Sequence, residues 1–206
     1  MSVHEPATLL TDLLLCALAG WLAWRLRRNH AISARWWSRA FLLTAASAFV
    51  GGTYHGLAPN LPAPVQSAWW IATLLLVCTT SATMACSLMQ EFLAPDRQRT
   101  ARILILLKFF AFAGATAMHP HFVLVIIDYG LTMTAWTFAA LAGRRAWRGW
   151  ILAGVGISGA GAVIQQSRWA PATWFNHNDV YHVAQALALL AFYRAGLRFH
   201  GSSDRP

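Results

Sequence analysis

The stretch ATLLTDLLLCALAGWLAWR, residues 7–25, decides the fold. It is long enough to cross the roughly 30 Å hydrocarbon core of a bilayer as one helix, and its only charged residues are Asp12 and the closing Arg25. His4 and Glu5 precede the stretch and the basic cluster follows it, which is the reverse of a cleavable signal peptide. We therefore predict a retained transmembrane helix.

Six further apolar stretches of similar length follow along the chain. They are residues 36–57, 67–90, 100–118, 121–142, 148–166 and 177–196. Only 11% of the 206 residues are Asp, Glu, Lys or Arg, against roughly 25% in soluble domains, and this difference excludes a soluble enzyme. The sequence predicts an all-α, seven-transmembrane helix bundle that forms one integral-membrane domain over residues 1–206.

The formal net charge of +9 is explained by topology better than by a nucleic-acid surface, and we expect no nucleic-acid partner. The basic residues cluster around the first, third and fifth predicted loops and in the C-terminal tail, whereas the even-numbered loops hold only Arg168. Short loops rich in Arg remain cytoplasmic. We predict a multi-pass cell-membrane protein, in the inner membrane if the cell is Gram-negative, with its N-terminus outside and its C-terminus cytoplasmic. Lys108 lies within a span, within snorkelling reach of the inner surface, and we expect it to be a structural residue.

Ionisable residues gather at one depth of the predicted bundle. An Asp at the centre of a transmembrane helix costs roughly 2.5–3.5 kcal/mol, so such residues usually face the bundle interior and mark function. Four of the predicted spans contribute carboxylates or imidazoles to the outer third of the membrane. These residues are Asp12, His55, Asp128, His177, Asp179 and His182. Their matched depth predicts a shared polar site facing the outer leaflet.

The start of the last span, FNHNDVYHVAQ, carries the densest polar cluster. Asn178, His182 and Gln185 share one face of a helix at 100° per residue. His177 lies five residues before His182, about 140° around a straight helix, so the two imidazoles converge only if His177 belongs to the lead-in turn or the helix contains a π-bulge. Asn178 and its neighbour Asn176 are also natural helix caps.

Two motifs, GGTYHG at 51–56 and HNDVYH at 177–182, resemble those of the CREST superfamily of transmembrane hydrolases, which includes alkaline ceramidases and adiponectin-receptor-like proteins. The resemblance covers most of the chain by topology and these two segments by motif. It implies a zinc site with His55, His177 and His182 as ligands, and hydrolysis of a lipid amide or ester. The spacing here is HxxxxH where the family has HxxxH, Gly51 replaces the family's Ser, and span 67–90 contains no Asp.

The implied chemistry is coherent. Three neutral imidazoles leave an open position on Zn²⁺, and a zinc-bound water has a pKa of about 7 and provides hydroxide. A nearby carboxylate would accept the water proton and pass it to the leaving amine or alkoxide. Asp128 is the first candidate for this base, while Asp12 and Asp179 would orient ligand imidazoles. A membrane lipid would reach the site sideways from the outer leaflet.

Two alternatives from other classes remain open at this point. His55 and His182 could be the axial ligands of a haem in a membrane electron carrier, which needs only two imidazoles. The Asp and His residues could instead form the relay of a sensor or proton-coupled transporter, although no pair of broken helices marks a midplane substrate site. The sequence does not predict an oligomeric state.

Overall fold

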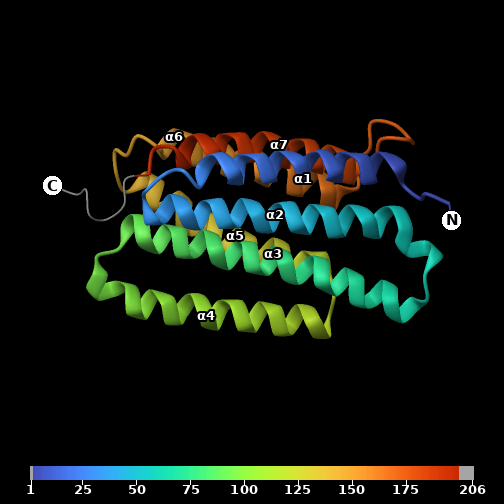
Figure 1. The fold of residues 1–206 in the computed structure, drawn as a ribbon, viewed down its shortest axis with the longest axis horizontal. Helices are drawn as coiled ribbons and strands as arrows, with labels where there is room; N and C mark the ends of the chain where they lie inside the picture. The colour runs from blue at the N-terminus through green and yellow to red at the C-terminus, as the bar shows by residue number, and fades with distance from the viewer. Residues whose placement is uncertain (1, 200–206) are drawn as a thin grey trace.

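The computed structural model describes residues 2–199, which fold into seven long α-helices packed side by side (Figure 1). Their bounds are α1 (Pro6–Leu26), α2 (Ile32–Leu57), α3 (Ala63–Phe92), α4 (Pro95–Met118), α5 (Phe122–Leu141), α6 (Arg148–Ser167) and α7 (His177–Gly196). A single 3₁₀ turn, η1 (Ala58–Asn60), follows α2. No β-strand occurs within 2–199, so the all-α prediction is confirmed.

Each predicted span is a helix, but three helices begin four or five residues earlier than the apolar pattern predicts. α2 begins at Ile32 instead of residue 36, α3 at Ala63 instead of 67, and α4 at Pro95 instead of 100. The first turns of α3 and α4 contain proline, whose fixed φ suits a helix start and whose missing N–H needs no partner there. Hydropathy therefore locates the apolar part of each helix and misses its polar or proline-containing first turn.

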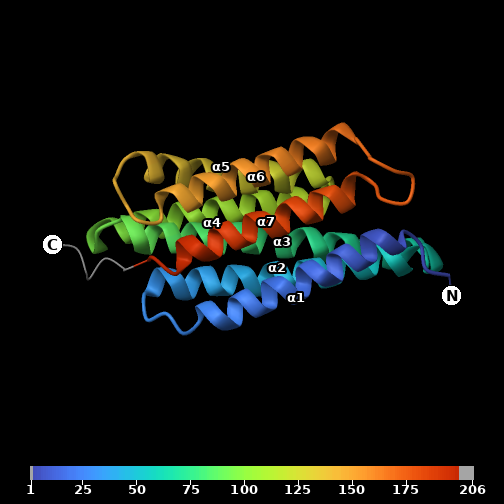
Figure 2. The same cartoon turned by 90° about the horizontal axis from the view of Figure 1, so that it is seen from above.

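Four of the described helices are long and apolar enough to cross a membrane by themselves, namely α1, α3, α4 and α5. The other three are less apolar along their length. α2 carries Arg35 and Arg39 in its first turns, α6 is rich in glycine, and α7 begins with the polar segment HNDVYH. Their helices nevertheless run along the same bundle as the four apolar ones (Figures 1 and 2).

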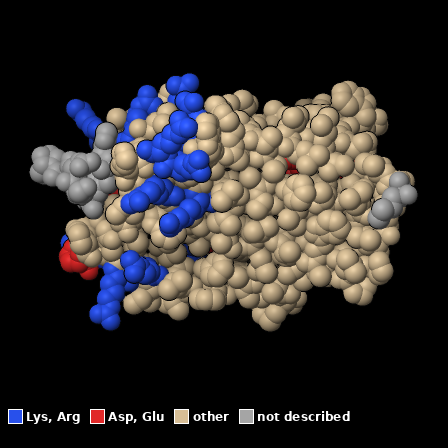
Figure 3. Space-filling view, viewed as in Figure 1, with Lys and Arg blue, Asp and Glu red and all other residues tan. Residues whose placement is uncertain are grey.

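The helices pack mainly on their sequence neighbours. α1 packs on α2 and α7, α2 on α3, and α6 on α7, whereas α4 packs only on α3 and α5. In Figure 1, α4 lies at the edge of the bundle, and Thr116 is its one buried residue. The two ends of the bundle differ in charge. Basic side chains gather at the end that carries the α1–α2, α3–α4 and α5–α6 connections, here called the basic end (Figure 3). The opposite end, where α1 begins, is called the N-terminal end.

Aromatic rings fill the half of the bundle near the basic end. The ring of Trp37 makes edge contacts with Trp136 at 4.9 Å, Phe192 at 5.5 Å and Phe199 at 5.7 Å between centroids. A Cβ atom added at Gly154 would overlap the Phe192 ring, so α6 can approach α7 closely only with glycine there. Such dense packing makes this half of the bundle a rigid support for the other half.

Candidate functional site

The N-terminal end of α7 is fixed by a capping box. The Asn176 side chain accepts hydrogen bonds from the backbone N–H groups of Asn178 at 2.8 Å and Asp179 at 3.4 Å. The Asp179 carboxylate accepts in return from the backbone N–H of Asn176 at 2.6 Å. This reciprocal arrangement satisfies N–H groups that a helix start leaves without partners. α7 therefore begins at His177 as an ordinary helix, and His182 lies about 8 Å further along its axis.

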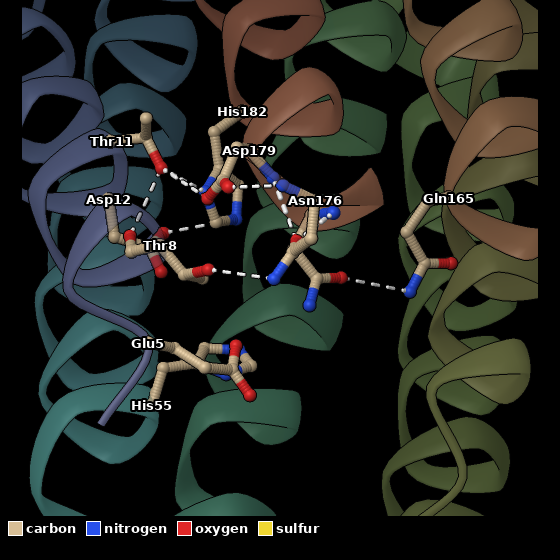
Figure 4. A network of polar contacts seen from close by, with 10 residues as sticks. Glu5, Thr8, Thr11, Asp12, His55, Gln165, Asn176, Asp179 and His182 are labelled. Carbon is tan, nitrogen blue, oxygen red and sulfur yellow. Dashed lines mark hydrogen bonds and ion pairs between the residues drawn. The ribbon is translucent and has the colours of Figure 1, made fainter. Parts of the chain in front are cut away.

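His182 is held between two side chains of α1 (Figure 4). Its Nε2 lies 3.3 Å from Asp12 Oδ1, and its Nδ1 lies 3.0 Å from Thr11 Oγ1. A neutral imidazole that donates from Nε2 to Asp12 accepts the Thr11 hydroxyl proton at Nδ1, which satisfies both ring nitrogens. Both Asp12 and His182 are buried. The contact joins α1 to α7 and fixes the orientation of the ring.

Thr11 connects this pair to the helix cap. Its hydroxyl also lies 3.4 Å from Asp179 Oδ1, and Asn176 Nδ2 donates to Thr8 Oγ1 at 3.3 Å. Figure 4 shows these side chains of α1 facing the first turns of α7. The capping box and the imidazole contact therefore belong to one hydrogen-bonded network between the two helices.

Glycine on α2 makes room for the Asp12 carboxylate. A Cβ atom at Gly52 would lie 2.6 Å from Asp12 Cβ, closer than real Cβ atoms approach, and 3.3 Å from its Cγ. Any larger residue at position 52 would push the Asp12 side chain away from α2. The motif GGTYHG thus contributes to the site through Gly52 as well as through His55.

His55 pairs with an acidic side chain through one of its two ring nitrogens. Its Nδ1 lies 3.3 Å from Glu5 Oε2, and Figure 4 shows this pair apart from the Asp12–His182 pair. The backbone N–H of His4 donates to Gly56 O at 3.0 Å, which ties the segment before α1 across the end of α2. This tie brings Glu5 to His55.

A cavity of about 520 Å³ lies between α1, α2, α3, α5, α6 and α7. Near the N-terminal end its wall is polar, and it includes Asp12, His55, His177, Asn178, Tyr181, His182 and Gln185. Deeper in the bundle the wall includes Leu15, Met133 and Leu189. Leu189 follows His177 by twelve residues, so the cavity extends about 18 Å along α7. It is a long space with its carboxylate and imidazole groups at one end, and its deeper wall is apolar apart from hydroxyls such as those of Thr44, Thr80 and Thr137, which donate to the backbone of their own helices.

Small residues form the wall of this cavity between α5 and α6. Gly130 and Thr134 of α5 face it, as do Gly159 and Ala162 of α6. A Cβ atom added at Gly130 or Gly159 would meet no atom within 4 Å, and Thr134 and Gly159 are exposed on the bundle surface. Small residues thus leave the cavity accessible from the side of the bundle.

The arrangement of the three histidines does not fit a zinc ion as it stands. Within residues 2–199 no group of three or more His, Cys, Asp or Glu side chains is placed to hold a metal. Both ring nitrogens of His182 face Asp12 and Thr11, and His55 Nδ1 faces Glu5. His177 lines the same cavity, but α7 contains no π-bulge that would turn it towards His182.

Asp128, the first candidate for the catalytic base, lies elsewhere. Its carboxylate forms an ion pair with Lys108 of α4, and it does not line the cavity. Lys108 Nζ also donates to Ser81 Oγ at 2.9 Å, and Ser81 lies 2.9 Å from Thr132 Oγ1. Lys108, which the sequence places within snorkelling reach of the inner surface, instead turns its ammonium group inward, because a buried carboxylate one helix away attracts it.

Asp179 also has a role other than the one predicted for it. It completes the α7 capping box and lies near Thr11, and within the described residues it contacts no histidine ring. Asp12 is the aspartate that contacts an imidazole. Sequence reasoning missed Thr11 and Glu5. Thr11 directly precedes Asp12 and carried no signal of its own, whereas Glu5 is an acidic residue at the outer end of the first span and could have been paired with His55.

One family model matches residues 7–200 and so covers all seven helices. The chain belongs to the DUF6962 family. This family is described as one of unknown function. The matched region includes every residue that lines the cavity described above. The chain matches no curated protein and no solved structure. The activity of this DUF6962 member is therefore inferred from the chemistry of its cavity.

Proposed function

We propose that the chain is a seven-pass membrane protein with the N-terminal end of the bundle outside and the basic end in the cytoplasm. Four helices are apolar enough to span a membrane, which supports this proposal. The other three helices support it too, because they lie alongside these four in one bundle (Figure 1). The shortest helices have 20 residues, about 30 Å, which matches the hydrocarbon thickness. The orientation is supported by the basic side chains at one end of the bundle (Figure 3).

We further propose that the protein hydrolyses an amide or ester bond of a membrane lipid in the outer-leaflet half of the bundle. One observation carries this proposal: the buried Asp12–His182 pair lies in the polar wall of a cavity whose deeper wall is mainly apolar. A single acyl chain fits the deeper part and would bring its head-proximal bond to the pair. The wall of small residues between α5 and α6 provides a sideways path from the lipid.

Asp12 is the catalytic base in this proposal, and His182 positions it. His182 Nε2 lies 3.3 Å from Asp12 Oδ1, while Asp12 Oδ2 receives no hydrogen bond from the described part of the chain. Oδ2 takes a proton from a water molecule in the cavity as the water oxygen bonds to the lipid carbonyl carbon. The proton then passes to the leaving amine or alkoxide as the carbon–nitrogen or carbon–oxygen bond breaks. The products are a fatty acid and an amine or alcohol.

Zinc binding and membership of the CREST superfamily stay predictions. To bind one ion, His182 would have to leave Asp12 or Thr11, whereas His55 could bind through Nε2 and keep Glu5 at Nδ1. The haem alternative likewise requires His182 to be freed. No step of the proposed reaction is routed through a metal. Elemental analysis of the purified protein tests for zinc, and a visible absorption spectrum tests for haem.

The activity is tested with the full chain in lipid nanodiscs and a panel of N-acyl amides and acyl esters, with fatty acid release measured by mass spectrometry. We expect the wild type to release fatty acid from at least one substrate class, and Asp12→Asn to abolish the release. Asp96→Asn is a suitable control, because Asp96 is exposed in the first turn of α4 at the other end of the bundle. Binding of acyl substrates without release would contradict hydrolysis and leave a lipid-binding protein.

A further inference from the structure

A second cavity, of about 570 Å³, lies between α3, α4 and α5 near the basic end of the bundle. Apart from Lys108 and Thr132 its walls are apolar. Ala101, Leu104, Ile105 and Lys108 line it from α4, a spacing that places all four on one face of that helix. The cavity is therefore a groove that runs along α4 for about two turns and ends at the Lys108–Asp128 ion pair.

The groove has the length of one lipid leaflet. On α5 it extends from Leu131 to Ala142, eleven residues or about 17 Å. Half of the roughly 30 Å hydrocarbon core is about 15 Å. Leu104 and Phe138 line the groove and are also exposed on the bundle surface, at 61% and 68%, so the groove is open sideways to lipid. A single acyl chain of the leaflet at the basic end would fill it.

Arginines surround the mouth of this groove. Arg97 lies one helical turn before Ala101 on the groove face of α4, and Arg102 is the next residue after Ala101. Arg144 and Arg145 follow the last groove residue of α5. Within residues 2–199 none of these four arginines forms an ion pair with an acidic side chain. Their guanidinium groups are available to an anion.

Several other arginines at the basic end stack on aromatic rings. The guanidinium of Arg28 lies 4.4 Å from the Trp24 ring centre, and that of Arg39 lies 4.6 Å from the Trp36 ring centre. No such ring contact occurs for the four groove arginines in the described part of the chain. The groove therefore joins an apolar space of leaflet length to unengaged guanidinium groups, which form paired hydrogen bonds with phosphate.

We propose that this groove binds one anionic phospholipid, with an acyl chain against α3, α4 and α5 and the phosphate beside Arg97 and Arg102. Basic pockets between transmembrane helices on the cytoplasmic side are typical sites for acidic head groups. The bound lipid attaches α4, the most weakly packed helix, to the rest of the bundle. This site goes beyond the outer cavity and does not depend on its chemistry. It requires only that α3, α4 and α5 span the membrane.

The test is native mass spectrometry of the full chain purified in detergent and mixed with equal amounts of phosphatidylglycerol and phosphatidylcholine. We expect the wild type to retain phosphatidylglycerol in preference. The double variant Arg97→Gln, Arg102→Gln should lower that preference by about fivefold for each arginine removed. The control double variant Arg28→Gln, Arg39→Gln removes the same amount of charge from arginines that stack on tryptophan rings. It should leave the preference for phosphatidylglycerol unchanged.

A second variant tests the groove itself with its arginines intact. Ala135→Phe puts a ring into the groove from an exposed position on α5, and Ala17→Phe puts the same ring on an exposed position of α1. We expect only Ala135→Phe to lose the retained phosphatidylglycerol, and circular dichroism to show equal helix content in both variants. Equal retention of the two lipids by the wild type, equal loss in both arginine pairs, or full retention by Ala135→Phe would each overturn the proposal.

Discussion

Asp12 and Asp128 are two buried aspartates in equivalent places on their helices, and they have opposite surroundings. Each lies six residues after the first residue of its helix, about 9 Å along the axis, and they are 4% and 0% exposed. Asp12 faces an imidazole and a cavity, whereas Asp128 faces an ammonium group and packed helices. Depth in the bundle therefore does not distinguish a reactive carboxylate from a structural one. The partner and the adjoining space do.

The largest expected effect separates the two aspartates by activity. Asp12→Asn should lower hydrolysis by about 10²–10⁴-fold, which leaves no detectable release of fatty acid, because an amide cannot accept the water proton. Asp128→Asn should leave the rate constant per folded molecule within a few-fold of the wild type, because Asp128 does not line the cavity. The measurement is initial rate divided by the amount of folded protein. Equal losses in the two variants would remove the distinction between the sites.

The second effect is a loss of stability at the Lys108–Asp128 ion pair. Lys108→Met leaves the Asp128 carboxylate buried without its cation, which should lower the free energy of unfolding by about 3–5 kcal/mol. Replacing both partners, with Lys108→Met and Asp128→Leu, should recover most of that loss. Unfolding in mixed detergent micelles measures both. If the double variant is as unstable as Lys108→Met alone, the two side chains stabilise the fold by more than neutralising each other's charge.

Gly52→Ala tests the Asp12 side through its packing. The new Cβ atom would overlap Asp12 Cβ, so we expect a loss of about 1–3 kcal/mol in stability together with a fall in activity. Gly20→Ala on α1 is the matched control, since its Cβ atom would meet nothing within 4 Å and alanine favours the helix by up to about 1 kcal/mol. If Gly52→Ala keeps full activity, the close fit of Asp12 against α2 has no role in positioning it.

The smallest expected effect comes from Thr11→Val, which keeps the side-chain shape and removes the hydroxyl beside His182 Nδ1. One hydrogen bond contributes about 1 kcal/mol, so activity should fall about five- to tenfold. Thr53→Val is the control, because the Thr53 hydroxyl bonds only to the backbone of its own helix within the described residues. An unchanged rate in Thr11→Val would show that Asp12 alone orients the ring.

The sequence was sufficient to predict the helices and insufficient to predict the partners within the site. Apolar runs of span length predict α1–α7 because a helix in lipid must be apolar over most of its length. The face that each polar residue presents depends on helix rotation, which short apolar spans do not encode. The apolar pattern therefore does not predict the Asp128–Lys108 ion pair, although two isolated opposite charges in adjacent spans could have indicated it.

The histidines illustrate the same limit. The polar layer at one depth predicted that His55, His177 and His182 share a site, and all three line one cavity. Their individual partners, Glu5 for His55 and Thr11 with Asp12 for His182, depend on how the segment before α1 crosses α2 and how α1 packs on α7. These contacts join residues far apart in the sequence, so spacing within one segment could not predict them.

The most direct measurement is the fate of solvent oxygen during turnover in water labelled with heavy oxygen. If Asp12 activates a water in the outer cavity, wild-type protein should release fatty acid carrying one labelled oxygen, Asp128→Asn should do the same, and Asp12→Asn should release none. Labelled product from Asp12→Asn at the wild-type rate, or no product from any lipid amide or ester with the wild type, would contradict the account.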